Sequence, residues 1–303
     1  METLALATSI VRSLGISVAR TSALRGGNQN HVVRVNGGGR DLVVRFAKVS
    51  DQVADPFDVE AWCLRAAATA GIPSSPMVAR GWLDGLSYLV VDYVAGSTAS
   101  ASDPGAWRSI GRFASVLAEL DVTDAPETLF SRFGRDLDAA WLAHLDYNRA
   151  ALTEGDELVD LGVYRPDERS RLLSLLDSLQ QRSLPQGLIH GDMSTRNLLG
   201  GERHTLIDWG AATVGPVVWG DLERIHRWKL LEDPESAVSD VAWANVLEGS
   251  GLTDTEATTV VRELTVLQAL DVIRWALEVR PDRLSSLVPQ STALLSRALN
   301  SND

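Results

Sequence analysis

In the first part of the chain, short runs rich in β-branched residues alternate with joins rich in glycine and asparagine. The runs "ISVARTSAL" (16–24), "HVVRV" (31–35) and "DLVVRFA" (41–47) are typical of β-strands. The joins "RGGNQN" and "NGGGR" suit turns, because glycine and asparagine tolerate positive φ angles. The pattern predicts a three-stranded antiparallel meander.

A helix and a second hairpin follow the meander. The segment "DPFDVEAWCLRAAATAG" (55–71) predicts a helix, and Pro56 suits its first turn. "MVARGWL" (77–83) and "SYLVVDYV" (87–94) are then typical of two strands joined through "DGL". Together these elements predict a five-stranded antiparallel sheet with one inserted helix.

From residue 95 onward the apolar spacing is mainly helical. The stretch "AGSTASASDPG" (95–105) is rich in small and turn-forming residues and separates the two parts of the chain. Apolar residues recur at helical spacing in the segments 105–121, 131–151, 166–181, 219–231, 235–249, 254–280 and 283–299. We therefore predict an α+β fold of two lobes, with residues 1–94 in the first and residues 95–303 in the second.

Charge is distributed unevenly between these lobes. The formal net charge is −12, which argues against a nucleic-acid or anionic-membrane partner. Residues 1–95 hold nine Lys/Arg and eight Asp/Glu, whereas residues 96–303 hold nineteen and thirty-two. An acidic second lobe favours a cationic small molecule, although a solvated acidic surface explains it equally well.

No run of apolar residues is long enough for a membrane span, and the first fifteen residues suit an amphipathic helix better than a signal peptide. Cys63 is the only cysteine, so no internal disulfide forms. We expect a cytoplasmic protein that works as a monomer or homodimer.

The exception to helicity in the second lobe is residues 185–210, where polar residues follow two short apolar runs. "LIHGDMSTRNLL" carries Asp192 and, five residues later, Asn197, and "LIDWG" places Asp208 eleven residues further on. Kinase chemistry uses residues in this order: one Asp accepts the proton of the substrate hydroxyl, and an Asn and a second Asp bind the metal that bridges the nucleotide phosphates. Taken alone, the His-Gly-Asp triplet is more typical of an ordinary turn than of a catalytic site.

These stretches resemble the aminoglycoside phosphotransferase family, the antibiotic-kinase branch of the protein-kinase-like superfamily. The resemblance implies a bilobal protein-kinase-like fold, with Asp192 as catalytic base, Asn197 and Asp208 as Mg²⁺ ligands, and His190 as a support of the catalytic loop. "GPVVWGDLERI" resembles a later stretch of the family with altered spacing, which leaves the role of Asp221 open.

The resemblance extends to the first lobe, which it identifies as the nucleotide-binding lobe. Gly26 and Gly27 match a loop that covers the phosphates, although the segment also suits an ordinary hairpin turn. Arg45, in place of a lysine, matches the phosphate-contacting cation of the third strand, and Glu60 matches its helix partner. Lys48 is the rival cation, but strand alternation puts it on the opposite face from Arg45.

The family also binds adenine at the connection between the lobes, through backbone groups and apolar side chains. That connection corresponds here to Asp92, Tyr93 and Val94. On the C-terminal helices, Asp271, Trp275 and Glu278 lie at helical spacing and could face a cationic acceptor, although such residues are more typical of a solvated helix edge.

The sequence therefore predicts an ATP- or GTP-dependent O-phosphotransferase that uses Mg²⁺ and acts on a hydroxyl of a small molecule. An aminoglycoside or other antibiotic is the first acceptor to consider, and a macrolide is next. The alternatives are a metabolic kinase of the choline, homoserine or ketosamine type and a catalytically silent nucleotide-binding module. A metal hydrolase would need further ligands that the spacing of His and Asp does not supply.

Overall fold

Contacts within the chain divide it into two units. The computed structural model describes residues 2–24, 30–47, 55–201 and 203–300. What we call the sheet unit comprises residues 1–99, 123–129 and 197–212, and what we call the helical unit comprises residues 100–122, 130–196 and 213–303. The division into functional domains at residue 94 stays a prediction, and the contact units differ from it because two later segments join the sheet unit.

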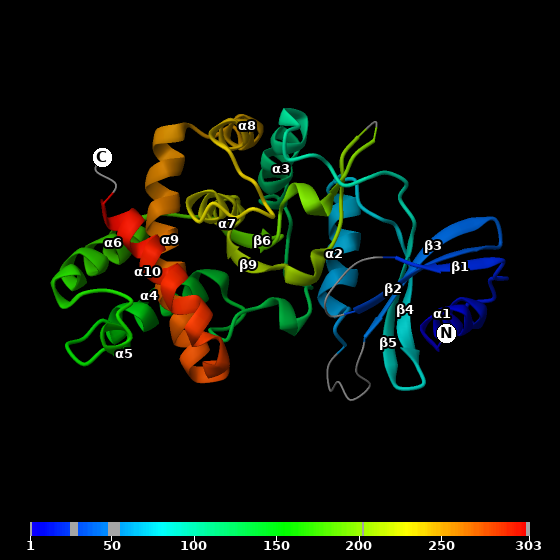
Figure 1. The fold of residues 1–303 in the computed structure, drawn as a ribbon, viewed down its shortest axis with the longest axis horizontal. Coiled ribbons are helices and arrows are strands. Elements are labelled where there is room, and N and C mark those ends of the chain that lie inside the picture. Colours follow the sequence, from blue (N-terminus) through cyan, green and yellow to red (C-terminus); the bar gives the residue numbers. More distant parts are fainter. Residues whose placement is uncertain (1, 25–29, 48–54, 202, 301–303) are drawn as a thin grey trace. The chain divides into compact units, whose positions relative to one another are not determined.

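The sheet unit is built on five antiparallel strands in the order β1-β2-β3-β5-β4 (Figure 1). The strands are β1 (Arg20–Ala23), β2 (Asn30–Gly37), β3 (Arg40–Ala47), β4 (Met77–Leu83) and β5 (Leu86–Asp92). The predicted meander and second hairpin are confirmed, although the first strand begins four residues later than predicted. Asp84 and Gly85 join the hairpin with φ angles of 51° and 77°, as a two-residue turn of this hand requires.

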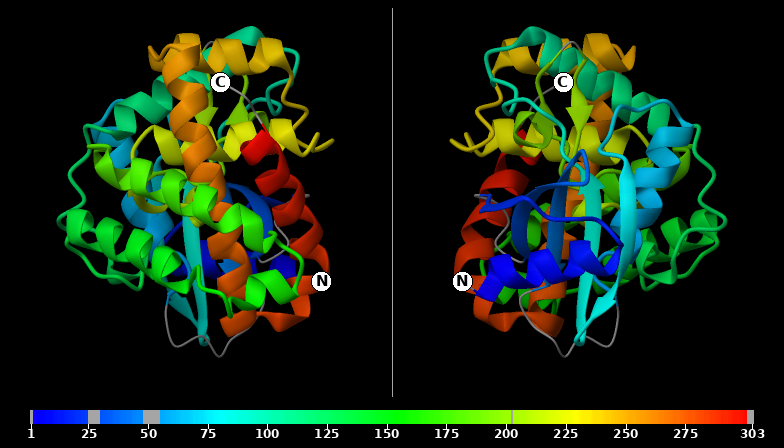
Figure 2. Two further views of the ribbon diagram at one scale, coloured as in Figure 1. Left: turned by 90° about the vertical axis from the view of Figure 1, so that its left-hand side faces the viewer. Right: turned by 90° about the vertical axis from the view of Figure 1, so that its right-hand side faces the viewer.

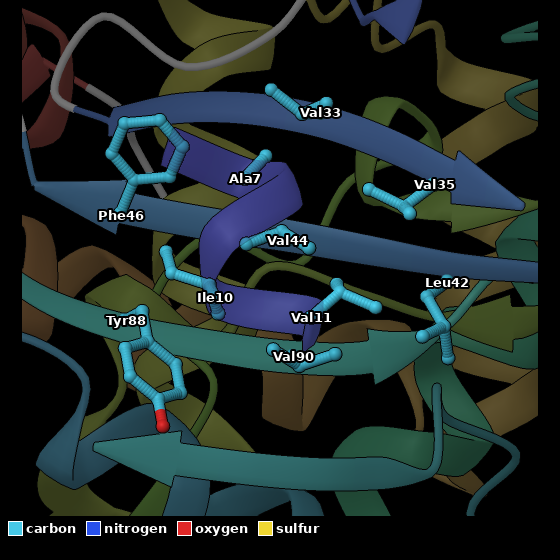
Figure 3. Packing of buried hydrophobic residues seen from close by; sticks show 10 residues of the cluster. All are labelled: Ala7, Ile10, Val11, Val33, Val35, Leu42, Val44, Phe46, Tyr88 and Val90. Carbon is cyan, nitrogen blue, oxygen red and sulfur yellow. The ribbon is translucent and has the colours of Figure 1, made fainter. Parts of the chain in front are cut away.

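One face of the sheet is covered by helix α1 (Glu2–Ser13), which crosses the strands in the right-hand view of Figure 2. Ile10 and Val11 of this helix pack in a buried cluster with alternate residues of the strands, among them Val44 and Phe46 (Figure 3). Successive side chains of a strand point to opposite faces. Arg45, between these two, therefore points to the other face, toward helix α2 (Asp58–Thr69).

Two later segments belong to the sheet unit because they bond to it. The short strands β7 (Leu198–Leu199) and β8 (Thr205–Leu206) pair with each other. The Ala99 N–H donates to the Leu198 carbonyl at 2.7 Å, and the Leu206 N–H donates to the Pro73 carbonyl at 2.8 Å. The segment 123–129 includes the 3₁₀ turn η1 (Glu127–Leu129) and is held to α2 by Asp124, which accepts from the Trp62 indole N–H.

The helical unit contains every long helix predicted for the second lobe. Its helices are α3 (Pro104–Leu117), α4 (Leu137–Ala151), α5 (Glu157–Asp160), α6 (Arg169–Gln181), α7 (Trp219–Leu230), α8 (Asp240–Ser250), α9 (Asp254–Val279) and α10 (Leu284–Asn300). It also contains the strand pair β6 (Gln186–Ile189) and β9 (Thr213–Pro216) and the short turns η2 (Pro166–Glu168) and η5 (Pro281–Arg283). The left-hand view of Figure 2 shows α10, in red, beside the long helix α9.

Two predicted helices begin later than the periodicity suggested, because a capping residue stands inside the predicted segment. Asp136 accepts a hydrogen bond from the Ala139 N–H and starts α4, and Ser239 does the same for the Ala242 N–H at the start of α8. The one-turn helix α5 was not predicted. Among the helices of the described residues, none combines the length and apolar character needed to cross a membrane.

Helices α3 and α8 pack backbone against backbone. A Cβ atom added at Gly111 would lie 2.0 Å from the Val246 carbonyl oxygen, and one added at Gly249 would lie 2.1 Å from the Arg108 carbonyl oxygen. Both distances are shorter than any non-bonded contact allows, so only glycine fits at these two positions. The helices can approach this closely because neither presents a side chain there.

Candidate active site

The predicted catalytic loop begins where strand β6 ends in the helical unit. The N–H groups of His190 and Gly191 donate to the two carboxylate oxygens of Asp221, at 3.0 and 2.8 Å. Asp221 lies in the first turn of α7 and is only 1% exposed. Burial raises the pKa of its carboxyl to about 6, and the two N–H donors oppose that shift. Asp221 therefore anchors the start of the loop.

His190 and Asp192 follow this anchor. His190 is fully buried, and its Nδ1 accepts a 3.3 Å hydrogen bond from the Asp192 backbone N–H. The Asp192 side chain is half-buried, and Arg196 Nη2 lies 4.0 Å from its Oδ1 atom. Arg196 also bonds Glu235 at 2.8 Å. The buried imidazole sits where a support of the loop is needed, and the carboxylate of Asp192 remains accessible.

The predicted metal ligands Asn197 and Asp208 lie in the sheet unit, on neighbouring backbone segments. Asn197 ends the 3₁₀ turn η3 (Thr195–Asn197), and its carbonyl accepts from the Ile207 N–H at 2.9 Å. Asp208 comes next in the chain, at a φ of 65°, before the turn η4 (Trp209–Ala211). The pairing of β7 with β8 thus brings together two residues that are eleven positions apart.

Arg45 connects Asp208 to helix α2. Its Nη1 atom bonds Glu60, and its Nη2 atom lies 3.2 Å from Asp208 Oδ1. Glu60 is 4% exposed, and burial raises the pKa of its carboxyl to about 7, although the Arg45 charge opposes the shift. The structure thus places Arg45 and Glu60 in the predicted pairing. Lys48, Gly26 and Gly27 lie outside the described residues.

Arg45, Glu60 and Asp208 lie at one end of a pocket of about 390 Å³ within the sheet unit. The pocket is otherwise mainly apolar, and its walls include the side chains of Leu24, Val32, Val43, Leu64, Val91, Val94, Leu199 and Ile207. Arg45, Glu60, Tyr93 and Asp208 also line it. A pocket with apolar walls and a charged end suits a ligand that has both a flat base and phosphates.

Of the predicted hinge residues, Tyr93 and Val94 line the pocket and Asp92 does not. The Asp92 side chain instead bonds Arg40 at 2.7 Å. The Tyr93 N–H donates to the Asp41 carbonyl at 2.8 Å, and its ring is covered by the Arg34 guanidinium at 3.7 Å. Arg34 is in turn held by the Asp41 carboxylate. Sequence reasoning did not identify this arginine, because its partners are set by strand register.

The C-terminal candidates lie in the helical unit, on α9, and two of them have partners there. His144 Nε2 lies 3.0 Å from Asp271 Oδ1, and Glu278 accepts from the Tyr147 hydroxyl at 2.6 Å and pairs with Arg132. Asp271 and Glu278 are therefore more than solvated residues at a helix edge, because each carboxylate has a side-chain partner on another segment. Trp275, by contrast, is 40% exposed.

The loop of the helical unit has an accessible carboxylate, and the apolar pocket of the sheet unit has a charged end. Each of these features is typical of a phosphotransferase. Comparison with known proteins agrees: residues 20–228 match the model of the phosphotransferase enzyme family, and the chain belongs to this family. The prediction made from the motifs is confirmed. A search of the curated proteins found no match.

Solved structures show the same fold. Aminoglycoside phosphotransferase APH(4)-Ia aligns with a TM-score of 0.63 at 18% identity, covering 97% of this chain and 98% of that chain. Spectinomycin phosphotransferase APH(9)-Ia, in complex with ADP and spectinomycin, aligns with a TM-score of 0.51 at 14% identity, covering 95% and 93%. An aminoglycoside-3′-phosphotransferase of type VIII gives 0.51 at 21% identity, covering 89% and 100%. The predicted fold class, α+β with two lobes, is confirmed.

Proposed function

We propose that the protein transfers the γ-phosphoryl group of ATP or GTP to a hydroxyl of an antibiotic of the aminoglycoside class. The observation that carries the proposal is the Glu60–Arg45–Asp208 chain at the charged end of an otherwise apolar pocket. Related folds have been solved with spectinomycin and ADP, and with hygromycin B and AMP-PNP. The acidic helical part of the chain, with its excess of carboxylates, also suits a cationic acceptor.

The nucleotide base would lie between the apolar walls, near Tyr93 and Val94. The N–H groups of Asp92 and Tyr93 already donate to the Pro76 and Asp41 carbonyls, at 2.9 and 2.8 Å. A base at this end therefore needs another donor, and the Val94 N–H is the next along the chain. Arg45 would contact the phosphates, since its guanidinium presents parallel donors to phosphate oxygens.

The residues at the charged end also fit Mg²⁺. Asp208 offers a 48% exposed carboxylate, and Asn197, on the neighbouring segment, would supply its side-chain amide oxygen. Mg²⁺ is commonly held by one or two protein oxygens and completes its shell with water and phosphate. In the part of the chain that the structure describes, no three His, Cys, Asp or Glu side chains form a metal site by themselves. Bound Mg²⁺ would neutralise phosphate charge during transfer.

Asp192 would act as the base. Its carboxylate would orient the acceptor hydroxyl and accept its proton, while the hydroxyl oxygen bonds to the γ-phosphorus and the bond to the nucleoside diphosphate breaks. Asp192 and Asn197 are five positions apart in the chain, which is the spacing of the base and the metal ligand in the kinase catalytic loop. His190 and Asp221 would hold this loop in place.

Residues of α9 would bind the acceptor. For Asp271 or Glu278 to bind an acceptor amine, the amine must displace His144 or Arg132 from its carboxylate. Trp275 offers an exposed aromatic face that would suit a sugar or a macrolide ring. We therefore place macrolides second and metabolic alcohols third, and expect a cytoplasmic monomer or homodimer.

Phosphorylation assays test the proposal. The purified protein would be incubated with Mg²⁺, ATP or GTP, and aminoglycosides including hygromycin B and spectinomycin, with macrolides and metabolic alcohols as parallel arms. Product would be detected by mass spectrometry. Asp192→Ala should lower kcat by about 10²- to 10⁴-fold and leave nucleotide binding intact. Nucleotide binding without product from any acceptor would favour the silent module instead.

A further inference from the structure

The Arg45 guanidinium holds two carboxylates that differ in their surroundings. Glu60, on one side, is almost completely buried, and Asp208, on the other, is 48% exposed. Breaking a buried ion pair strands a charge away from water and costs about 3–5 kcal/mol, whereas an exposed pair contributes only about 0.2–1 kcal/mol. The contact with Glu60 is therefore the fixed one, and the contact with Asp208 is the one that can be exchanged.

The exchangeable contact involves an oxygen that a metal would need. Arg45 Nη2 lies 3.2 Å from Asp208 Oδ1, and Asp208 is the only carboxylate that we assign to Mg²⁺. A guanidinium and a divalent cation both require the negative charge of this carboxylate. The Arg45 guanidinium therefore competes with the metal for Asp208.

We propose that Arg45 occupies Asp208 as a stand-in cation in the nucleotide-free protein, and that nucleotide phosphates release it so that metal and nucleotide bind together. The proposal deepens the proposed function and rests on it for the identity of the nucleotide and the metal. Arg45 would remain bonded to Glu60 and turn its Nη2 group from Asp208 to the phosphate oxygens. The free protein would then bind divalent metal weakly, and the nucleotide would raise that affinity.

The exchange also implies reciprocal coupling. If nucleotide binding strengthens metal binding by removing Arg45 from Asp208, metal binding must strengthen nucleotide binding by the same factor. Removal of Arg45 should therefore affect the two ligands in opposite directions. Metal affinity of the free protein should rise because a competitor is gone, and nucleotide affinity should fall because a phosphate contact is gone. A purely structural role for Arg45 would lower both affinities.

The test measures Mn²⁺ binding to nucleotide-free protein by electron paramagnetic resonance, and binding of an ATP analogue by calorimetry. Arg45→Met should raise Mn²⁺ affinity about three- to fivefold, the size expected for loss of an exposed ion pair. The same variant should weaken nucleotide binding about tenfold or more. In an Asp208→Asn background, Arg45→Met should give no gain in Mn²⁺ affinity, which separates this site from other acidic groups on the surface.

Arg80→Met is the matched control. Arg80 also bridges two carboxylates of the sheet unit, Asp55 and Asp58, but it does not line the pocket. The Arg80→Met variant should leave nucleotide affinity unchanged, and it should give no increase in Mn²⁺ affinity that depends on Asp208. Should Arg45→Met unfold because Glu60 is left buried without its partner, Arg45→Met/Glu60→Gln removes both members of the pair and should show the same opposite changes.

Three outcomes are decisive. Normal nucleotide binding by the wild type, together with unchanged or weaker Mn²⁺ binding in both Arg45 variants, would overturn the exchange and leave the proposed function standing. Failure of the wild type to bind ATP or GTP would instead overturn the proposed function and the exchange with it. A gain in Mn²⁺ affinity that persists in the Asp208→Asn background would also overturn the exchange, because Arg45 would then act elsewhere.

Discussion

The Asp208 carboxylate of the sheet unit and the Asp221 carboxylate of the helical unit are held in opposite ways. Asp208 is 48% exposed and contacts one guanidinium, whereas Asp221 is 1% exposed and accepts two backbone N–H bonds. A side-chain partner can turn away when a ligand arrives, but backbone donors cannot. The difference indicates that Asp221 fixes the loop and that Asp208 is available to a ligand.

The largest effect should come from the exposed carboxylate. Asp208→Asn should lower kcat by about 10³-fold, since a metal ligand contributes several kcal/mol to stabilising the transition state. Its free energy of unfolding should change by less than about 0.5 kcal/mol, because the group is half exposed and its ion pair is weak. Steady-state kinetics and urea denaturation measure the two quantities. A large loss of stability in this variant would contradict the contrast with Asp221.

Substitution of the buried carboxylate, Asp221, should instead have a large effect on stability. Asp221→Ala strands the N–H groups of His190 and Gly191 in a buried site, and each unsatisfied donor costs about 1–3 kcal/mol. We expect the free energy of unfolding to fall by about 3 kcal/mol in urea titrations. Activity should fall as well, with nucleotide affinity retained, because the pocket lies in the other unit. Wild-type stability in Asp221→Ala would show that the loop does not depend on this anchor.

Glu60, another buried carboxyl, should make the stability of the protein depend on pH. Its pKa in the folded protein is raised to about 7, above the usual value of 4.5. The folded state therefore binds more protons than the unfolded state between these values, and this group makes stability fall as pH rises from about 4.5 to 7. The stability of Glu60→Gln relative to wild type should therefore rise by about 3 kcal/mol as pH increases through that window, whatever the difference between the two proteins at low pH. Denaturation at several pH values checks the slope, and parallel curves for the two proteins would remove Glu60 as its cause.

The smallest effect should come from Glu235, whose pair with Arg196 is exposed. The Glu235 side chain is 77% exposed, and such pairs contribute little to stability. Glu235→Gln should change the free energy of unfolding by less than about 0.5 kcal/mol. A larger change, seen in the same urea titration, would mean that exposure is a poor guide to the strength of these pairs and would weaken the argument for Asp208.

The sequence was informative where local periodicity and motif spacing determine the structure. Strand alternation predicted that Arg45 and Lys48 lie on opposite faces of the strand. The structure describes Arg45, which lies beside Glu60 on the face away from the α1 core. The anchoring role of Asp221 was left open because the spacing after strand β9 is irregular. Val218, just before α7, has a φ of 68°, a conformation that costs a β-branched residue about 1–3 kcal/mol and has no sequence signature.

Contacts between distant residues were the least predictable. Arg132 and Glu278 meet across 146 positions, and nothing in the helical spacing of α9 indicates that its carboxylates have partners on another segment. Likewise, Arg34 covers Tyr93 only because the register of the strands brings them together. Sequence patterns identify the chemistry of single residues, whereas their partners depend on packing.

The contact between α3 and α8 has a consequence for mutational scanning. Elsewhere in the core, substitution by alanine removes atoms, and the loss of stability measures the contacts that have gone. At Gly111 and Gly249 alanine adds an atom where a carbonyl oxygen already lies. An alanine scan that omits glycines as uninformative would therefore miss this backbone contact between two helices, and a scan that includes them would measure steric exclusion.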